Sequence, residues 1–489
     1  MAELIKTDIL VIGAGSGGLS VAAGAAQMGA DTVLIERGRM GGDCLNYGCV
    51  PSKSLIAAAR TAHIARTGAV FGIHSSGMAA RLQAGGGSRL EPADSGIGVD
   101  FLRVHDHIHE VIATIAPHDS QERFEGLGVR VLRESARFTA PREVRAGDHI
   151  VRARRMVIAT GSRPRVPAIA GIDRVPFLTN ETIFDNQTLP EHLMIIGAGP
   201  IGLEMAQAHR RLGARVTVLS HSRALPKDDP QLAAMVVARL RAEGVDIHEG
   251  VEIETLASEG RGIRLAARLN GSRLILEGSH LLVATGRRPN VEDLDLEQGG
   301  IDYGPKGIEV DSRLRTSDPK IYAIGDVAGG PQFTHVASYH AGIVIRNALF
   351  RLPAKVNYKA LPWVTYTDPE LAQVGLTLEQ ARQQRGKVQA LDWDFSDNDR
   401  AQTERETQGR VRVVVDGRGR ILGATIAGAR AGELIAPWIL AIDRGLKVKH
   451  LAGLIIPYPT LGEVNKRAAG SYFTPKLFSS TTRGLVRFL

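Results

Sequence analysis

The chain has 489 residues but only two cysteines, so it cannot be a small secreted scaffold stapled by disulfides. Aromatic residues make up only 5%, and they do not alternate with basic residues as they do on many nucleic-acid-binding surfaces. No apolar run approaches the roughly 18 residues of a membrane-spanning helix. Residues 8–13 have the pattern of a buried strand, which argues against a signal peptide there. We therefore expect a cytoplasmic protein without a membrane span or a nucleic-acid partner.

The composition indicates several large hydrophobic cores. At about 150 residues per domain, the length corresponds to roughly three domains. The chain is 44% hydrophobic and 23% charged, as is usual for globular proteins. Its 60 basic and 52 acidic residues give a net charge of +8. Because the basic residues are scattered, we interpret the excess as a solvated surface that mildly favours anionic cofactors.

A short apolar strand followed by GxGxxG occurs twice, at residues 9–18 and 193–202. Each copy has a later ATGxRP segment, at residues 159–164 and 284–289. An Ala-rich stretch suited to a helix and a second apolar strand follow each glycine cluster, which is the order of a parallel sheet covered by helices. The predicted fold class is therefore α/β, with two Rossmann-like dinucleotide-binding domains. The glycines are Gly13, Gly15 and Gly18 in the first copy and Gly197, Gly199 and Gly202 in the second.

The rest of the chain has a different character. Residues 73–98 are rich in small and turn-forming residues, which indicates a surface insertion or loop, and residues 100–123 look helical. Two strand-like runs flank Asp416–Gly419, a hairpin signal that indicates a third, α+β domain from about residue 354. The tail at 471–489 carries aromatic residues and arginines, and we expect a docked or frayed terminus rather than a membrane or partner contact.

The residue that ends the second strand differs between the two copies. Glu36 lies 18 residues after Gly18, where an acid holds a ribose hydroxyl, so the first copy suits a nucleotide without a 2′-phosphate. The second copy has Ser220 at that spacing and Arg223 close behind, and these could bind a 2′-phosphate. We therefore expect NADPH rather than NADH. The alternative is that Arg223 points to solvent and Ser220 hydrogen-bonds to either ribose.

Both cysteines lie in one segment, Gly41–Lys53, as Cys44 and Cys49. Residues 52–60 have a helical pattern, so the pair lies near a helix N-terminus, where the helix dipole favours a thiolate. In a reducing compartment a close pair is more often catalytic than structural, because two thiols in reach can exchange a disulfide. The alternatives are two inert buried cysteines or half of a zinc site. We expect no metal site, because the segment has no histidine and the chain has no second cysteine pair.

The segment Gly41–Lys53 resembles the redox-active motif GGTCLNxGCxPSK of the flavin-dependent pyridine nucleotide–disulfide oxidoreductases. This family includes dihydrolipoamide dehydrogenase, glutathione reductase and mercuric reductase. Both glycine clusters, both ATGxRP segments and Tyr322–Asp326 match as well, whereas Asp43 stands where the family commonly has Thr. The resemblance implies FAD and NAD(P)H as cofactors. It also implies a homodimer in which electrons pass between the nucleotide and a dithiol or disulfide substrate.

The resemblance implies individual roles too. Cys49 would be the charge-transfer thiolate against the flavin, and Cys44 the interchange thiol that faces the substrate. Lys53 and Glu204 match the family's ion pair near the flavin. The implied contacts to FAD are Gly13, Gly15, Gly18, Glu36, Gly42, Lys53, Thr160, Gly161 and Asp326. The implied contacts to the pyridine nucleotide are Gly197, Gly199, Gly202, Ser220, Arg223 and Gly286.

The domain boundaries follow from the same motifs. We expect an FAD-binding domain at 1–160 with the insertion at about 73–98, a NAD(P)-binding domain at 161–289 and a second FAD-binding segment at 290–353. A dimerisation domain at 354–470 and the tail at 471–489 complete the chain. In the implied homodimer, the C-terminal loop of each subunit completes the active site of the other.

One departure from the family limits the substrate. Disulfide-reducing members carry HPTxxE near the C-terminus, whereas this chain has Tyr458 in place of the histidine and keeps Glu463. A phenol, with a pKa of about 10, is a poor general base at neutral pH. His335, His340 and His450 are candidate substitutes. The leading hypothesis is a dihydrolipoamide dehydrogenase-like enzyme, and the alternatives are a mercuric reductase-like metal or quinone reductase or a flavoprotein that senses redox state without turnover.

Overall fold

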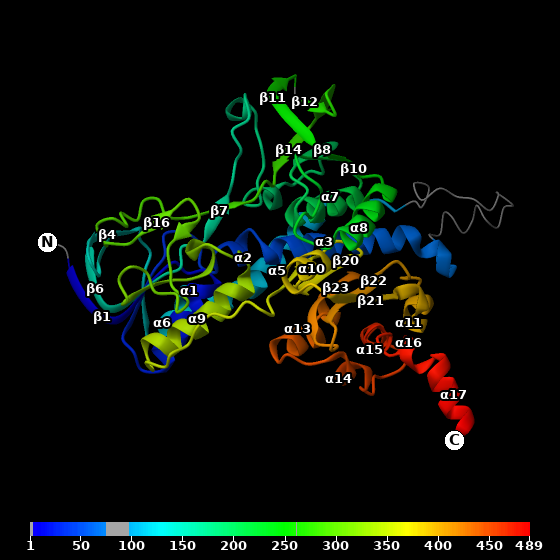
Figure 1. The fold of residues 1–489 in the computed structure, drawn as a ribbon. Coiled ribbons are helices and arrows are strands. Elements are labelled where there is room, and N and C mark those ends of the chain that lie inside the picture. Colours follow the sequence, from blue (N-terminus) through cyan, green and yellow to red (C-terminus); the bar gives the residue numbers. More distant parts are fainter. Residues whose placement is uncertain (1–2, 75–96, 261) are drawn as a thin grey trace. The chain divides into compact units, whose positions relative to one another are not determined.

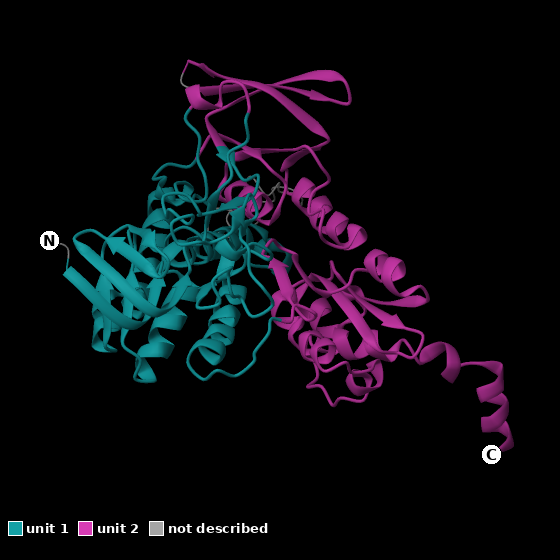
Figure 2. Cartoon of the chain, turned by 60° about the vertical axis from the view of Figure 1, so that its left-hand side comes forward, with its two compact units in different colours: residues 1–168, 176–189, 282–356 teal, residues 169–175, 190–281, 357–489 magenta. Residues whose placement is uncertain are grey.

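The computed structural model describes residues 3–74, 97–260 and 262–489 (Figure 1). The chain divides into two compact units (Figure 2). Unit 1 comprises residues 1–168, 176–189 and 282–356, and unit 2 comprises residues 169–175, 190–281 and 357–489. Most of the predicted insertion at 73–98, residues 75–96, lies outside the described residues. The finer division at residues 160, 289, 353 and 470 remains a prediction.

Unit 1 is built on one sheet with the strand order β3-β2-β1-β6-β5-β4, and β18 also pairs with β6. The pairs β3-β2, β2-β1, β1-β6 and β18-β6 are parallel, whereas β5 is antiparallel to both of its neighbours. The strands are β1 (Glu3–Ile12), β2 (Thr32–Ile35), β3 (Val129–Leu132), β4 (Ala136–Ala140), β5 (Glu143–Ala146), β6 (His149–Ile158) and β18 (Ile321–Ala323). The predicted strands at residues 9–12 and 32–35 are confirmed.

The parallel part of this sheet is buried on both faces, because alternate residues of each strand point to opposite sides. Leu10 and Met156 belong to one core cluster, and Ile9 and Val157 belong to the other. Among the described residues, the helices of unit 1 are α1 (Ser16–Gln27), α2 (Gly42–Asn46), α3 (Cys49–Thr67), α5 (Phe101–Ile115), α6 (Gln121–Gly126) and α9 (Thr334–Ala348). α1 and α9 lie side by side over the sheet (Figure 1). The helical pattern at 100–123 is confirmed, as α5 and α6 with a short 3₁₀ turn between them.

Short paired segments complete unit 1. β7 (Ser162–Pro164) and β15 (Arg287–Pro289) form an antiparallel pair, so the two ATGxRP segments lie beside each other. β16 (Tyr303–Gly304) and β17 (Gly307–Ile308) form a small hairpin. The Gly-Asp turn that follows β18 is a 3₁₀ helix, Gly325–Ala328.

Unit 2 contains the second β–α–β segment and the C-terminal sheet. The first sheet has the order β10-β9-β8-β14, in which β8, β9 and β10 are parallel. Its elements are β8 (His192–Ile196), α7 (Pro200–Leu212), β9 (Arg215–Ser220), α8 (Pro230–Ala242), β10 (Asp246–Glu249) and β14 (His280–Val283). An antiparallel sheet of β11 (Val251–Glu259), β12 (Gly262–Leu269) and β13 (Ser272–Gly278) follows β10 in the chain. The predicted strands at 193–196 and 215–219 are confirmed.

The C-terminal part of unit 2 has a five-stranded sheet in the order β19-β20-β23-β22-β21. Its strands are β19 (Pro362–Thr365), β20 (Glu370–Gly375), β21 (Val388–Asp394), β22 (Arg410–Asp416) and β23 (Ile421–Gly428). The predicted hairpin is β22-β23. The helices are α10 (Leu378–Arg385), α11 (Asp399–Glu404), α12 (Ala431–Leu434), α13 (Ala436–Asp443), α14 (Val448–Ala452), α15 (Glu463–Gly470), α16 (Thr474–Leu477) and α17 (Ser480–Phe488). Trp438 is fully buried in this core and donates from Nε1 to Asn465 Oδ1 at 2.7 Å.

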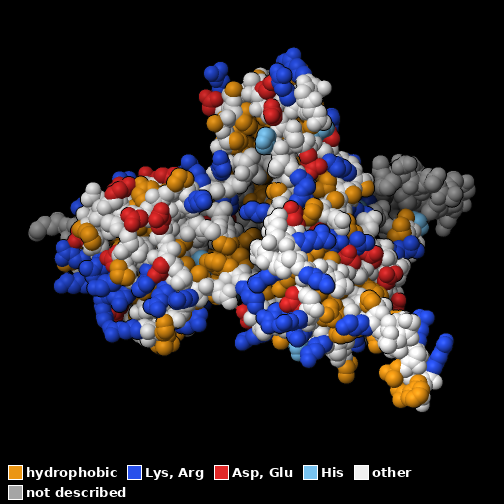
Figure 3. Space-filling model, viewed as in Figure 1, with side chains coloured by type: hydrophobic (Ala, Val, Ile, Leu, Met, Phe, Trp, Pro, Cys, Tyr) orange, Lys and Arg blue, Asp and Glu red, His pale blue; other side chains and the backbone are white. Residues whose placement is uncertain are grey.

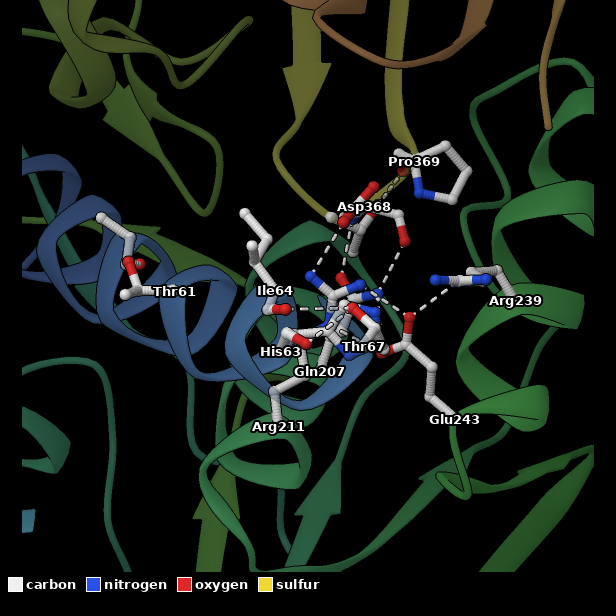
Figure 4. A network of polar contacts seen from close by, with 12 residues as sticks. Thr61, His63, Ile64, Thr67, Gln207, Arg211, Arg239, Glu243, Asp368 and Pro369 are labelled. Atoms are coloured by element: carbon white, nitrogen blue, oxygen red, sulfur yellow. Dashed lines mark hydrogen bonds and ion pairs between the residues drawn. The ribbon is translucent and has the colours of Figure 1, made fainter. Parts of the chain in front are cut away.

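A buried ion-pair network joins α7 to the loop between β19 and β20 within unit 2 (Figure 4). Arg211 of α7 binds both carboxylate oxygens of Glu243, at 2.6 and 2.8 Å, and Asp368 Oδ2 at 2.9 Å. Arg239 donates to Glu243 as well, at 2.7 Å. The side chains of Arg211 and Glu243 are only 4% and 9% exposed, so each depends on the other's charge.

On the face shown in Figure 3, Lys and Arg side chains are spread across both units with Asp and Glu among them. The predicted tail forms α16 and α17. Leu485, Val486 and Phe488 of α17 are largely exposed in the single chain. None of the helices in the described ranges is both long and apolar enough to cross a membrane.

Candidate active site

The first glycine turn joins β1 to α1 and has the backbone that only glycine readily adopts. Gly13 has φ +104°, and a Cβ on Gly18 would lie 1.9 Å from the Gly13 carbonyl oxygen. At Gly15 a Cβ would meet no protein atom within 4 Å. Gly15 is the N-cap of α1, no side chain caps it, and the first turn has no acidic residue. The free N–H groups and the helix dipole therefore suit a phosphate group.

Glu36 stands directly after β2, beside that turn. Its two carboxylate oxygens accept hydrogen bonds from the backbone N–H groups of Ala14 and Gly38, each at 2.6 Å. These bonds fix the carboxylate next to the glycine turn and leave further lone pairs for a ribose hydroxyl. Its role in holding a ribose stays a prediction.

Gly42 closes the other side of this turn. A Cβ on Gly42 would lie 2.7 Å from the Gly15 Cα, so the cysteine segment approaches the first glycine turn backbone to backbone. Thr160 donates to the Asn290 carbonyl oxygen at 2.8 Å, and Gly161 has φ +68° with open space at its Cβ position. Open backbone on a helix N-terminus, with a carboxylate beside it, fits the adenosine and pyrophosphate parts of FAD.

Asp326 lies in the 3₁₀ turn after β18. It accepts a hydrogen bond from Ser162 Oγ at 2.5 Å, and burial raises the pKa of its carboxyl group. The predicted base candidate His340 is buried behind this turn, where its Nδ1 accepts from the Gly325 N–H at 3.1 Å. Burial lowers the pKa of His340 to about 4, so it is neutral at pH 7 and supports the turn. His335 stacks on Phe333, with ring centroids 5.2 Å apart.

The second glycine turn, in unit 2, repeats the geometry of the first. Gly197 has φ +115°, and a Cβ on Gly202 would lie 2.0 Å from the Gly197 carbonyl oxygen. Gly199, the N-cap of α7, has open space at its Cβ position. Ser220 is buried at the end of β9. Arg223 donates to backbone carbonyl oxygens of the loop before α8, at 3.3 Å.

The two cysteines lie in two consecutive helices of unit 1. Cys44 is in α2, and Cys49 is the first residue of α3. Cys49 Sγ lies 3.3 Å from the Thr334 hydroxyl oxygen at the start of α9. A hydrogen bond from Cys44, the bond with Thr334 and the charge of Lys53 lower the pKa of the Cys49 thiol to about 6. The bond to Cys49, burial and the charge of Asp43 raise the pKa of Cys44.

The pair therefore has one thiol that ionises readily and one that does not. No disulfide joins the two sulfurs. Sequence reasoning placed the pair at a helix N-terminus but missed Thr334, Asn180 and Arg287, which contact this segment. No local pattern marks them, although Arg287 lies inside the second ATGxRP segment.

Other predicted site residues are distributed over both units. Lys53, in unit 1, donates from Nζ to Ser52 Oγ at 3.3 Å. Glu204, in unit 2, accepts from the Tyr366 N–H at 2.9 Å. Their pairing with each other stays a prediction. Gly286 lies beside β15 of unit 1, with open space at its Cβ position.

Tyr458 and Glu463 lie in the C-terminal part of unit 2. The Tyr458 hydroxyl donates to Asp399 Oδ2 at 2.9 Å, and this bond and the carboxylate charge raise the pKa of the phenol. Tyr458 is therefore ionised even less at neutral pH than an ordinary tyrosine, which makes it even less available as a general base, and its proton is engaged with Asp399. Glu463 begins α15. His450, the third candidate base, bonds through its ring nitrogen to the Lys447 backbone.

Within the ranges that the structure describes, no group of three or more His, Cys, Asp or Glu side chains is arranged to hold a metal ion.

Comparisons with known proteins identify the family. Residues 7–341 match the family model "Pyridine nucleotide-disulphide oxidoreductase", and residues 361–469 match its dimerisation domain. A mercuric reductase of Streptomyces lividans is 35% identical over 95% of this chain and 96% of that protein. A dihydrolipoyl dehydrogenase of Geobacillus stearothermophilus is 34% identical, with the same coverage.

A solved structure is similar along most of the chain. The Cu(II) complex of the HOCl-induced flavoprotein disulfide reductase RclA from Escherichia coli superposes with a TM-score of 0.81. The two sequences are 27% identical, and the match covers 94% of this chain and 98% of the other. With its cysteine pair, two glycine turns and dimerisation domain, this chain belongs to the pyridine nucleotide–disulphide oxidoreductase family of enzymes, which use FAD and a pyridine nucleotide.

Proposed function

We propose that Cys44 and Cys49 are the redox-active pair of this enzyme and that electrons pass between NADPH and a substrate through FAD and these two sulfurs. The observation that supports the proposal is the asymmetry of the pair. Cys49 begins α3, with the Thr334 hydroxyl 3.3 Å from its sulfur and a pKa of about 6, whereas the pKa of Cys44 is raised. Cys49 is thus stabilised as a thiolate, whereas Cys44 keeps its proton.

The residues around the pair would act as follows. The N-terminus of α3, the Thr334 hydroxyl and the Lys53 ammonium stabilise negative charge on Cys49. In the disulfide-reducing direction, the Cys44 sulfur attacks the substrate disulfide, and its proton goes to the substrate sulfur that leaves. Cys49 then attacks Cys44, forms the Cys44–Cys49 disulfide and releases the second substrate thiol. FAD, held by the first glycine turn, Glu36 and Asp326, would exchange a hydride with the nicotinamide and an electron pair with the disulfide.

The assembly that we propose is a homodimer. The dimerisation domain at residues 361–469 supports it. In such a dimer, Tyr458 and Glu463 of the partner subunit would face Cys44. Free thiols are kept reduced in the cytoplasm, and we propose that the enzyme works there.

A metal ion is the second candidate substrate, and Tyr458 is the observation that favours it. Exchange with a dithiol needs a group that removes a proton at neutral pH, and the Tyr458 phenol, bonded to Asp399, has a raised pKa. A metal ion that binds thiolates needs no such base. The relatives named mercuric reductase and the Cu(II) complex of the similar reductase support this direction.

An anaerobic experiment separates the candidates. The oxidised holoenzyme is mixed with dihydrolipoamide, and flavin reduction is followed with NAD⁺ or NADP⁺ as the final acceptor. Parallel samples receive NADPH with Hg(II) or Cu(II). Dihydrolipoamide turnover supports the dithiol substrate, metal-dependent NADPH oxidation supports the second candidate, and no turnover with either leaves the redox-sensor hypothesis.

Tyr458 offers matched variants for the same assay. We expect Tyr458→His to raise dithiol turnover, because imidazole titrates near pH 7. Tyr458→Phe removes the hydroxyl and keeps the ring, so it reports whether the hydroxyl itself is used. If Tyr458→His leaves dithiol turnover unchanged, the missing base is not what limits this substrate.

The preference for NADPH rests on Ser220 and Arg223. Arg223→Glu should raise the KM for NADPH by about tenfold or more and change that for NADH much less, since it replaces a cation near the expected 2′-phosphate by an anion. Arg215→Glu, an exposed arginine at the opposite end of β9, is the control. Equal effects of Arg223→Glu on both nucleotides would refute the assignment.

A further inference from the structure

Asp43, which stands where the family commonly has Thr, touches both cysteine segments. It precedes Cys44 in α2. One of its carboxylate oxygens, Oδ2, lies close to Gly48: a Cβ added to Gly48 would be 2.8 Å from it. Gly48 is the N-cap of α3, and Cys49 follows it. A single carboxylate is therefore the shared neighbour of the two segments that carry the sulfurs.

Asn180 and Arg287 hold that carboxylate. Arg287 Nη2 lies 3.0 Å from Asp43 Oδ1, and Asn180 Nδ2 donates to the same oxygen at 3.1 Å. Asn180 also donates to the Tyr47 carbonyl oxygen at 3.2 Å and accepts from Arg287 at 3.3 Å. Asn180 thus holds the chain at Asp43 and at Tyr47, on either side of Cys44. It is only 8% exposed, so these bonds are shielded from water.

Arg287 connects this clamp to the turn proposed to bind the flavin. It donates to the Ser162 hydroxyl at 2.7 Å and to the Ser162 carbonyl oxygen at 2.9 Å. The Ser162 hydroxyl in turn donates to Asp326, whose carboxylate lies 3.8 Å from the guanidinium. One cation, whose side chain is 13% exposed, thus lies between two carboxylates, one beside the sulfurs and one beside the expected cofactor.

The charges in this region act on the sulfurs in opposite directions. The negative charge of Asp43 raises the pKa of both thiols, and the positive charge of Lys53 lowers that of Cys49. Asp43 also contributes to the raised pKa of Glu181 and Asp326, for which burial is the larger cause. Arg287 is the cation that balances Asp43.

We propose that Asp43, held by Arg287 and Asn180, is a positioning residue that sets the charge beside the Cys44–Cys49 pair and thereby its reduction potential. The proposal rests on the proposed redox role of the pair. A carboxylate disfavours the thiolate of the reduced pair and leaves the neutral disulfide unaffected, so it makes the pair a stronger reductant. Arg287 limits this effect by neutralising the carboxylate.

Two variants with opposite expected shifts test the proposal. In reduced holoenzyme, the pH dependence of the long-wavelength thiolate–flavin absorbance gives the thiolate midpoint. Equilibration with dithiothreitol, followed by alkylation and mass spectrometry, gives the potential. Asp43→Asn should lower the midpoint and make reduction of the disulfide about threefold to tenfold more favourable, as expected for removing one nearby charge. Arg287→Gln should shift both quantities the other way.

Controls separate charge from structure. Arg287→Lys keeps the cation and should keep the midpoint near that of the wild type. Asp311→Asn removes a carboxylate that pairs with Arg315 elsewhere in unit 1 and should change neither quantity. If Asp43→Asn and Arg287→Gln lower the melting temperature but leave midpoint and potential unchanged, the network is structural only and the proposal is wrong.

The outcome also distinguishes this inference from the proposed function. If the wild-type pair does not interconvert between dithiol and disulfide, the redox role itself fails. If the wild type interconverts and the two variants shift in the same direction, only the role of Asp43 and Arg287 fails.

Discussion

Cys44 and Cys49 are the only cysteines of the chain, so each single substitution leaves one thiol to measure. In Cys44→Ser the remaining thiol is Cys49, and the serine hydroxyl can still donate the hydrogen bond that Cys44 provides. In Cys49→Ser the remaining thiol is Cys44, with burial and Asp43 still raising its pKa. We expect the two variants to differ strongly in the pH dependence of alkylation by iodoacetamide.

The expected magnitude follows from the thiolate fraction. With a pKa of about 6, Cys49 is about 90% thiolate at pH 7 and about 24% at pH 5.5. An ordinary thiol with a pKa of about 8.5 is about 3% and 0.1% ionised at these pH values. The lower basicity reduces the intrinsic nucleophilicity of Cys49 by about 13-fold. Cys49 should therefore react roughly 20-fold faster than an ordinary thiol at pH 5.5, and only about twofold faster at pH 7.

The assay is the alkylation rate of each reduced variant between pH 4 and 10, read by intact-protein mass spectrometry. Cys44→Ser should show a midpoint near 6, and Cys49→Ser a midpoint above that of an ordinary thiol. Unfolded samples of both variants serve as the reference and should share one midpoint. Equal midpoints in the folded variants, or the reverse order, would refute the assignment of Cys49 as the stabilised thiolate.

Two further pairs of variants test the cofactor cradle and the charge network. Gly15→Ala should fold normally but lose bound flavin, because the new Cβ enters the open space at the α1 N-terminus where the phosphate is expected. Gly18→Ala should lose both stability and flavin, because its Cβ would lie 1.9 Å from a carbonyl oxygen. Flavin absorbance and melting temperature distinguish these results, and full flavin content in Gly15→Ala would contradict the cradle. Glu243→Gln should lower the free energy of unfolding by about 3 kcal/mol, because it leaves buried Arg211 with one partner fewer. Arg239→Gln, at a side chain 30% exposed, should cost less than about 1 kcal/mol; similar costs for the two would show that burial does not govern this network.

Local patterns were sufficient to predict the parts of the site that depend on neighbours in sequence. The glycine turns need positive φ and close backbone approach within about six residues, and a strand before them and a helix after them complete the pattern. The position of Cys49 at a helix start follows from the helical pattern that begins beside it. Strands β1, β2, β8 and β9 and the hairpin β22-β23 were predicted for the same reason, since strand periodicity and turn residues are local properties.

The sequence alone thus determined the fold class, the two dinucleotide turns, the cysteine pair and the missing histidine at Tyr458, because each is written in a short stretch of chain. The tertiary structure decided the partners of the sulfurs. Thr334 is 285 residues from Cys49, and it reaches the sulfur because α9 begins just after the Gly-Asp turn that follows β18. Asn180 and Arg287 reach Asp43 because β7 and β15 pair and bring separate segments together. Such contacts depend on strand order and packing, which no local pattern encodes. Among them, the Thr334 contact adds to the lowering of the Cys49 pKa, for which the bond from Cys44 is the larger cause.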